Sequence, residues 1–404
     1  MGCGQKVKDD RTWWKGNLHT HSLWSDGDDY PEMIVDAYKT AGYHFLALSD
    51  HNTLGDGEQW IVPSERGGMA AYQQYQQRFG GAWVVQKQEQ TTLSVRLKTL
   101  AEYRTRFEET GHFLLIQSEE ITDGFDGRPV HVNATNLATF IQPKGGSSVM
   151  EVMQHNVDAV LEQRRETGQP MFPHINHPNF GWGVTVEDLM GLEGERFFEV
   201  YNGHPAVRND GDAAHPGTER MWDIVLTDRI GHERPLLYGL AVDDSHNYHD
   251  GGLTKSNPFR GWVMVRAASL TADSLVVALE RGDFYASTGV TLKTIDFDGQ
   301  TLQLAIEDVP GVSYTTTFIG TRAGYAPGRA DTTLVGERMH VRQTYSDEIG
   351  VVLATVEGPA PQYTLQGDEL YVRARVVSSQ PKGNPYQEGE VERAWTQPVR
   401  ANKP

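Results

Sequence analysis

Short apolar runs alternate with helical patterns over roughly the first 290 residues, and this alternation predicts a β/α domain. The runs are short enough to be strands, and we expect strands at 45–48, 113–116, 130–132, 197–200 and 236–240. A helix is predicted to start at Asp29 as its N-cap and to stop at Gly42, with Pro31 in its first turn. Another helix is expected over 273–281, ending at Gly282.

Two stretches depart from this alternation. Residues 58–111 are rich in glutamine and only weakly periodic, so we expect a helical insertion that could cover a site. From 291 to 404, short β-type runs such as 314–319 and 370–374 are separated by Gly, Pro and Asp, which predicts a small antiparallel β-sandwich domain. The main α/β domain is therefore assigned to residues 13–290.

Length and charge limit the classes of function. The chain has 404 residues, of which 38% are hydrophobic, and because single cores stop growing near ~250–300 residues, two domains are expected. A net charge of -18 leaves no basic footprint for a polyanion, which excludes nucleic acid as a general partner. A small phosphorylated substrate stays open, because metal ions invert the local field. No stretch approaches the ~20 consecutive apolar residues of a membrane span.

Cys3 is the single cysteine, which excludes an internal disulfide framework and a cysteine-rich zinc module. Residues 1–12 are expected to be a disordered tail. Gly2-Cys3 followed by small and polar residues looks like the end of a bacterial lipoprotein signal, so Cys3 is a candidate lipid anchor, and an ordinary N-terminus is the alternative. This segment and the acidic composition favour a periplasmic or outer-membrane lipoprotein, with a cytoplasmic protein as the alternative.

The placement of histidine locates the candidate chemistry. Fourteen of the fifteen histidines lie between His19 and His249. On an extended strand His19 and His21 point to the same face, so both imidazoles can reach one ion. Ser25-Asp26-Gly27 follows closely and adds a carboxylate.

Further polar groups stand at the ends of apolar runs, where β/α folds build their active sites. One run ends in Asp50 and His51, although Asp50 could simply terminate the strand and begin a turn. Glu119 and Glu120 alternate faces on their strand, so only one of them can point at the same centre. His131 lies on the strand that follows.

Two more runs complete the set. His174 and His177 follow one apolar segment and compete for a ligand role. Asp244 and His246 are two residues apart and are expected to share a strand face, which repeats the geometry of the first histidine pair. Three other histidines are expected to be ordinary core or surface residues, namely His204, His215 and His249.

The ordered set of motifs resembles the polymerase-and-histidinol-phosphatase (PHP) family of metal-dependent phosphoesterases. It runs over about residues 13–290 as His-x-His with a downstream Ser-Asp-Gly, then Ser-Asp-His-Asn, Glu-Ile-Thr, Val-His-Val, His-Pro and Asp-x-His. The resemblance implies an α/β fold class, a distorted seven-stranded (β/α) barrel with metals at its carboxyl-end mouth, followed by the small antiparallel β-sandwich. A second likeness, in 371–374 and 394–398, is to the secreted or lipoprotein branch of carbaryl-hydrolase-like metallohydrolases.

Position by position, the resemblance implies three metal sites. The first ion would be held by His19, His21, Glu120 and Asp244. Glu120 would bridge to a second ion held by His51 and His131, and a third would be held by Asp26, His177 and His246. Glu120 is preferred over Glu119 because it precedes the Ile-Thr pair, and His177 over His174 because it carries the His-Pro pair.

We therefore expect two or three divalent ions, and the mixture of imidazole and carboxylate suits zinc, manganese or iron. A water shared by two cations loses a proton near neutral pH and attacks an ester. The catalytic residues are expected to be Glu120, Asp244 and His246. Asn202 and Arg260 are candidate substrate contacts, since an arginine can form a fork onto phosphate.

The predicted function is hydrolysis of a phosphomonoester or phosphodiester of a small molecule. A carboxylic or carbamic ester or amide hydrolase is the alternative, because the same water attacks carbon as readily as phosphorus. A non-catalytic glycan-binding surface lipoprotein is a second alternative, which the complete ligand set disfavours. A lysine or arginine in the mouth of the site would favour phosphate over an uncharged ester.

Overall fold

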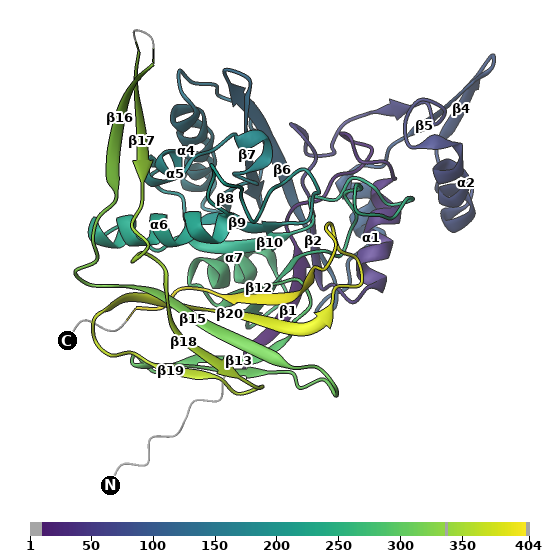
Figure 1. Ribbon diagram of the computed structural model, residues 1–404. Helices are drawn as coiled ribbons and strands as arrows, with labels where there is room; N and C mark the ends of the chain where they lie inside the picture. Colours follow the sequence, from purple (N-terminus) through teal and green to yellow (C-terminus); the bar gives the residue numbers. More distant parts are fainter. Residues whose placement is uncertain (1–9, 336–337, 401–404) are drawn as a thin grey trace.

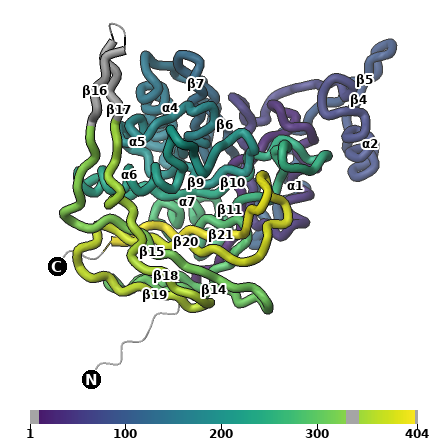
Figure 2. Tube along the Cα trace, in the orientation of Figure 1, coloured from purple at the N-terminus to yellow at the C-terminus, as the bar shows by residue number. Residues whose placement is uncertain are grey.

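The computed structural model describes residues 10–335 and 338–400 (Figures 1 and 2). The predicted tail and its candidate lipid anchor, Cys3, lie outside the described residues, except that the first strand already begins at Thr12. Within the described residues, no helix is both long and apolar enough to cross a membrane.

A sheet of 13 strands organises the molecule. In spatial order its strands are β10 (Tyr238–Val242), β9 (Phe197–Asn202), β8 (Phe172–Ile175), β7 (Arg128–Thr135), β6 (Leu114–Phe125), β2 (Phe45–Leu48), β1 (Thr12–Asn17), β11 (Trp262–Ala267), β12 (Phe284–Ser287), β21 (Val391–Thr396), β20 (Glu369–Pro381), β15 (Tyr314–Arg322) and β18 (Val351–Glu357). From β10 to β1 the neighbours are parallel, except that β7 is antiparallel to both β6 and β8. The five strands expected from the apolar runs are confirmed, and their ends agree to within three residues, except that β6 continues to Phe125 instead of ending at 116.

The carboxyl ends of the parallel strands are drawn together. A parallel bridge pairs Thr20, just beyond β1, with Ser245, just beyond β10, and another pairs His51 with Glu120. The fold is therefore mixed α/β, as expected, with a large sheet that is rich in parallel neighbours from β10 to β1 and antiparallel from β1 to β18. The closed barrel of seven strands stays a prediction, because β1 to β10 belong to a sheet that continues on the far side of β1.

Helices cover the strands of this region (Figure 1). They are α1 (Pro31–Thr40), α4 (Val149–Thr167), α5 (Val186–Gly191), α6 (Thr218–Gly231) and α7 (Ala272–Glu280), with a short 3-10 turn, η1 (Phe180–Trp182). The last predicted helix is confirmed as α7. The predicted N-cap of α1 is wrong: Tyr30 occupies that position without a side-chain cap, and the Asp29 carboxylate accepts from the Tyr30 N–H at 2.8 Å instead of from the first turn of the helix.

The insertion at 58–111 is only partly helical. It contains α2 (Gly68–Phe79) and α3 (Leu100–Phe107), but also a small sheet of β3 (Trp60–Ile61), β5 (Thr92–Arg96) and β4 (Gln86–Glu89). Strand β4 could not be predicted from the sequence, because all four of its residues are exposed and no apolar alternation marks it. In Figure 1 this insertion extends from the side of the molecule next to α1. Whether it covers the site stays a prediction.

The C-terminal strands are antiparallel, as predicted. Four of them, β21, β20, β15 and β18, extend the main sheet instead of forming a sheet of their own. A three-stranded sheet of β13 (Leu292–Phe297), β14 (Thr301–Ile306) and β19 (Gln362–Thr364) packs on β15 and β20 around Leu304, Phe318 and Val372. The hairpin of β16 (Arg329–Val335) and β17 (Arg338–Thr344) projects beyond them (Figure 1). Because β21 pairs with both β12 and β20, the main sheet runs without a break across the predicted boundary at 290.

A buried ion pair fastens the C-terminal strands to the helices. Arg373 of β20 donates to both carboxylate oxygens of Asp223 on α6, at 2.8 and 2.7 Å. The Tyr371 hydroxyl donates to the same carboxylate at 2.8 Å. Both charged side chains are almost completely buried, with residue exposures of 1% for Arg373 and 4% for Asp223. Arg373 also donates to Glu219 Oε2 at 3.1 Å, so without Asp223 this one contact would have to compensate its buried charge.

Replacing Asp223 with alanine should therefore lower the free energy of unfolding by about 3–5 kcal/mol, because the buried Arg373 guanidinium loses both hydrogen bonds to that carboxylate and keeps the one to Glu219. Urea denaturation followed by circular dichroism measures this loss. The matched control is Asp36→Ala, which removes a solvent-exposed ion pair with Arg78 and should cost much less, since water screens that pair. Equal stability of Asp223→Ala and the wild-type chain would show that the pair does not fasten the two parts.

Candidate metal centre

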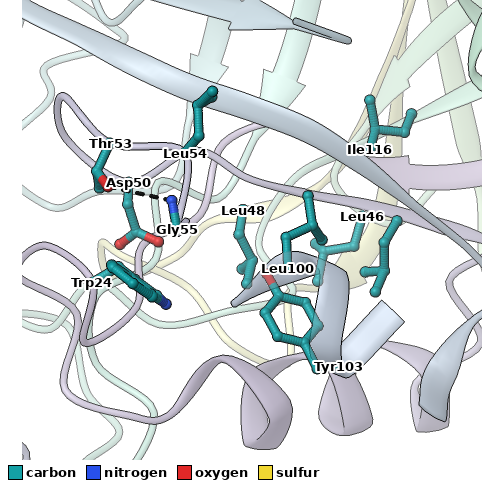
Figure 3. Close-up of a pocket in the computed structure, with 11 residues that line it drawn as sticks. Trp24, Leu46, Leu48, Asp50, Thr53, Leu54, Gly55, Leu100, Tyr103 and Ile116 are labelled. Carbon is teal, nitrogen blue, oxygen red and sulfur yellow. Dashed lines mark hydrogen bonds between the residues drawn. The ribbon is translucent and has the colours of Figure 1, made fainter. Parts of the chain in front are cut away.

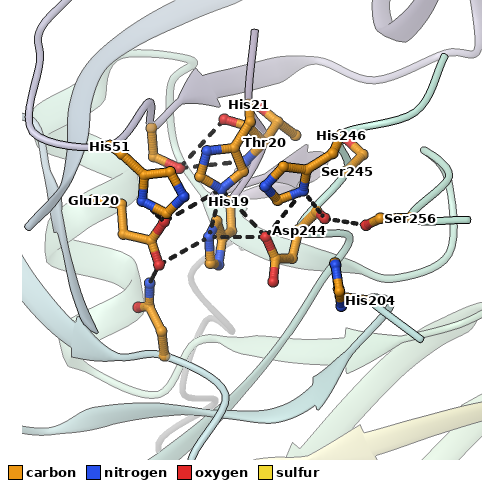
Figure 4. A network of polar contacts seen from close by, with 12 residues as sticks. His19, Thr20, His21, His51, Glu120, His204, Asp244, Ser245, His246 and Ser256 are labelled. Atoms are coloured by element: carbon orange, nitrogen blue, oxygen red, sulfur yellow. Dashed lines mark hydrogen bonds and ion pairs between the residues drawn. The ribbon is translucent and has the colours of Figure 1, made fainter. Parts of the chain in front are cut away.

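A cavity of about 220 Å³ opens at the carboxyl ends of the parallel strands. Seven of the residues that line it are histidines or carboxylates predicted as metal ligands: Asp26, His51, Glu120, His131, His177, Asp244 and His246. Phe180 and His204 complete the lining. Figure 4 shows how the imidazoles and carboxylates from different strand ends point toward one another.

The first histidine pair lies at the base of the cavity, just beyond β1. His19 and His21 are completely buried, and their Nε2 atoms are 3.1 Å apart. Both Nε2 atoms face Asp244 Oδ1, at 3.3 Å and 3.2 Å. Asn17 fixes the chain here, because its side-chain oxygen accepts from the His19 N–H at 3.0 Å. The structure thus brings the two histidines and Asp244 together, as expected.

Asp244 reaches the cavity by a turn rather than from a strand face. Strand β10 ends at Val242, and Asp244 has a φ of 50°, which lies in the left-handed region that non-glycine residues seldom adopt. The predicted alternation of an extended strand therefore does not apply to Asp244 and His246. Both side chains still reach the cavity, because the turn redirects them.

Glu120 lies between the histidines of three different strand segments, His51, His131 and His177. Its Oε1 lies 2.9 Å from His131 Nδ1 and 3.4 Å from His177 Nε2, and its Oε2 lies 2.8 Å from His51 Nδ1. Glu119 points to the other face of β6, where it accepts from the Ile141 N–H at 2.7 Å. Strand alternation therefore places Glu120, and not Glu119, at the cavity.

Of the two histidines in the segment of β8, one lines the cavity and the other lies behind it. His177 lines the cavity beside Glu120. His174 lies behind it, completely buried, with its Nε2 3.2 Å from Glu199 Oε1. Of the two competing histidines, His177 is the one placed at the cavity.

The predicted grouping of the third ion's ligands is wrong. Asp26 and His246 do lie together, with Oδ1 and Nε2 3.3 Å apart, but they are grouped with His21 and His51. His177 is grouped with His19 and Glu120 instead. The reason is topological, because β9 separates the end of β8, which carries His177, from the end of β10.

Asp50 organises the loop that carries Asp26. Its carboxylate accepts from the backbone N–H and hydroxyl of Ser22, both at 2.7 Å, and from those of Ser25, at 3.1 and 2.6 Å. Asp50 therefore does more than terminate a strand. Next to it lies a separate cavity of about 10 Å³, walled by Trp24 and Leu48 among others (Figure 3). That volume suits about one water molecule and no substrate.

Glu199 is a functional residue that the sequence analysis missed. It is completely buried and accepts from His19 Nδ1 at 2.6 Å, from the His177 N–H at 2.7 Å and from Asn202 Nδ2 at 2.8 Å. A carboxylate that accepts from Nδ1 directs the Nε2 lone pair of His19 into the cavity, the arrangement typical of histidine ligands. An acid inside the apolar run 197–200 was the available signal.

Neither predicted substrate contact is free to bind a substrate. Asn202 is buried and donates to Glu199 and to Asp244, at 2.8 and 3.1 Å, so it orients a candidate ligand. Arg260 is completely buried and does not line the cavity. Its guanidinium donates to the Asn257 side chain and to five backbone carbonyls, those of Gly203, Gly252, Lys255, Asn384 and Pro385.

The electrostatics of the cavity fit a bound cation. Burial opposes protonation of His19, but the carboxylates of Asp244, Glu199 and Glu120 outweigh it and raise its pKa well above the usual value. Burial likewise opposes ionisation of Glu120 and Asp244, yet the surrounding histidines keep the pKa of both carboxyls well below the usual value. Ionised carboxylates in a buried site require compensating positive charge, and divalent ions would supply it.

The donor set also fits. Five overlapping groups of side chains offer ligand atoms within 4.8 Å of one another: His21, Asp26, His51 and His246; His19, His174 and Glu199; His19, Glu120 and His177; His19, His21 and Asp244; and His51, Glu120 and His131. All nine predicted ligands fall in these groups. Imidazole nitrogens with carboxylate oxygens are the donors that zinc, manganese and iron accept.

Comparison with family models and with curated proteins finds no match. Among solved structures, a two-domain protein from Bacteroides vulgatus that contains a predicted PHP-like metal-dependent phosphoesterase is 15% identical, with 96% of each chain covered and a TM-score of 0.42. An amidohydrolase from Chromobacterium violaceum is 14% identical, with 58% of this chain and 88% of that one covered and a TM-score of 0.30. The carbaryl-hydrolase-like branch stays a prediction.

Replacing Glu199 with glutamine should weaken metal binding about 10- to 100-fold, because the side chain that holds His19 loses its charge and two of its acceptor sites. Competition with a chromophoric chelator measures the affinity. The matched control is Glu193→Gln, an exposed carboxylate just before β9, which should bind metal as the wild-type chain does. Unchanged affinity in Glu199→Gln would mean that Glu199 does not support the centre.

Proposed function

We propose that this protein is a metal-dependent hydrolase of the PHP type, and that it cleaves a phosphomonoester or phosphodiester of a small molecule. The observation that carries the proposal is the convergence of nine histidines and carboxylates from six strand segments, seven of which line one cavity of about 220 Å³. The carboxyl ends of parallel strands are where α/β folds bind small ligands.

The proposed ligands are His19, His21, Asp26, His51, Glu120, His131, His177, Asp244 and His246. We propose two or three divalent ions, of zinc, manganese or iron. When bound, such ions activate water and neutralise the negative charge that develops on the scissile group.

The side chains prepare this chemistry by fixing which nitrogen of each imidazole faces the cavity. His19 donates from Nδ1 to Glu199, and His246 donates from Nδ1 to the backbone carbonyl of Asp244 at 2.9 Å. In both residues the Nε2 lone pair is left for a cation. His246, predicted to be catalytic, is therefore assigned a ligand role. Glu120 is the proposed bridge, because its two oxygens face different histidines.

One observation favours the alternative substrate class. None of the residues that line the cavity is a lysine or arginine, and Arg260 is occupied elsewhere. An uncharged carboxylic or carbamic ester or an amide needs no such cation, so a hydrolase acting at carbon stays the alternative.

The complete ligand set argues against a non-catalytic glycan-binding protein. An envelope location with a lipid anchor at Cys3 also stays a prediction.

Metal content, measured by mass spectrometry on the purified protein, tests the proposal together with turnover of an aryl phosphate, a phosphodiester and a carboxylic ester. We expect at least two ions per chain. The variants His21→Ala, Asp244→Ala and Glu120→Gln should each lose metal, and their turnover should fall on the order of 100-fold or more, as it does when a group that stabilises developing charge is removed.

The control variant is His232→Ala, whose imidazole is exposed at the end of α6. It should keep both metal and turnover. The preferred ester then decides between chemistry at phosphorus and at carbon. A wild-type chain that cannot be loaded with metal and cleaves none of the three esters would contradict the proposal.

A further inference from the structure

The cavity has a wall that carries none of the candidate ligands. Seven of the nine lining residues are candidate ligands, and the other two are Phe180 and His204. Their rings lie against each other, with centroids 6.0 Å apart at an interplanar angle of 83°. In Figure 4, His204 lies beside Asp244 and His246, on the side away from His51 and Glu120. A substrate held by the ions would meet this wall.

The hydrogen bonds of His204 fix its tautomer. The Ala206 backbone N–H donates to His204 Nδ1 at 3.1 Å, so Nδ1 must carry a lone pair. The hydrogen of the neutral imidazole therefore sits on Nε2. Among the described residues no hydrogen-bond partner is found for this Nε2–H, and the atom is not one of the fully buried polar atoms that lack a partner.

This arrangement is the reverse of that in His19 and His246. Those two residues donate from Nδ1 and present an Nε2 lone pair, which suits a cation. His204 accepts at Nδ1 and presents an Nε2–H, which suits an oxygen acceptor and repels a cation. Independently of the tautomer, its ring nitrogens lie too far from the other ligand atoms to belong to any of the groups that could hold a metal. The same ring type thus serves two opposite purposes at one cavity.

The backbone of His204 is held firmly to the centre. Its N–H donates to Asn202 Oδ1 at 2.8 Å, and Asn202 in turn donates to Asp244. Arg260 donates to the carbonyl of Gly203 at 2.9 Å. A side chain at Gly203 would approach Arg260 Cβ to 2.7 Å and the Asp243 carbonyl to 2.9 Å, so glycine is required for this close packing. Arg260 therefore positions the loop instead of binding the substrate.

We propose that His204 is a substrate-contacting residue whose Nε2–H donates a hydrogen bond to an oxygen of the group being hydrolysed, with Phe180 as the apolar side of the same wall. This inference rests on the proposed hydrolase function. It also narrows the substrate: the group held against this wall offers an oxygen acceptor to one neutral donor, next to an aromatic ring. Lysine and arginine are absent from the lining, so no fork or point charge selects a second anionic group there.

The test compares His204→Ala and His204→Gln with the wild-type chain, each loaded with metal. Inorganic phosphate is the probe, because it offers the oxygen of a hydrolysed phosphoester, and its affinity is measured by calorimetry beside turnover of an aryl phosphate and a carboxylic ester. His204→Ala should keep its metal content but bind phosphate about 10- to 100-fold more weakly, as expected for the loss of a hydrogen bond to a charged group. Its kcat/KM should fall about 100- to 1000-fold, because a donor to developing charge is removed.

His204→Gln places an amide N–H near the former Nε2 and should recover part of both losses, which a merely structural role would not produce. The control is His215→Ala, whose exposed ring stacks on Trp182 outside the cavity and should change neither quantity. Loss of metal in His204→Ala would overturn the inference, because His204 would then support the ions. If His204→Ala and the wild-type chain bind phosphate equally and turn over substrate equally, the role of His204 is overturned while the proposed hydrolase function stands. A metal-loaded wild-type chain that neither binds phosphate nor cleaves either ester would contradict the proposed function and the role of His204 together.

Discussion

The buried negative charge of Glu120 and Asp244 is the constraint around which this molecule is built. Two ionised carboxylates in the interior are costly unless cations or several donors surround them. The fold satisfies them by bringing imidazoles from β1, β2, β7, β8 and β10 to the same point. The bridge between Thr20 and Ser245, the loop held by Asp50 and the contacts of Glu199 all serve that convergence.

A second layer of polar side chains decides what each member of the cavity can do. Glu199 and Asn202 do not line the cavity. Together with the backbone carbonyl of Asp244, they set the tautomers and positions of the side chains that do. The same imidazole group becomes a cation ligand or a hydrogen-bond donor according to what its Nδ1 meets. Function at this centre therefore depends on residues that touch neither metal nor substrate.

The candidate ligands could be predicted from the sequence better than the polar side chains that orient them. His19 and His21 could be predicted from their spacing of two residues, and His51 and Glu120 because they follow short apolar runs. Strand alternation showed that only one of Glu119 and Glu120 could face the centre, and the Ile-Thr pair after Glu120 decided the choice. Contacts between distant segments left no such pattern. The grouping of His177 with Glu120, the tautomer of His204 and the use of Arg260 depend on which strand ends become neighbours and on backbone groups that any residue could supply. Likewise, β4 lacks the alternation that would reveal a strand.

The continuous sheet has a consequence for how the chain can be divided. Strand β12 has β11 on one side and β21 on the other, so a chain cut at 290 would leave the backbone donors and acceptors of one edge unpaired. An exposed edge of this kind invites pairing with another copy and aggregation. It would also leave Asp223 of α6 without Arg373. The part that carries the candidate metal centre and the C-terminal strands thus share one sheet, and shortened forms for crystallisation or engineering should keep β21.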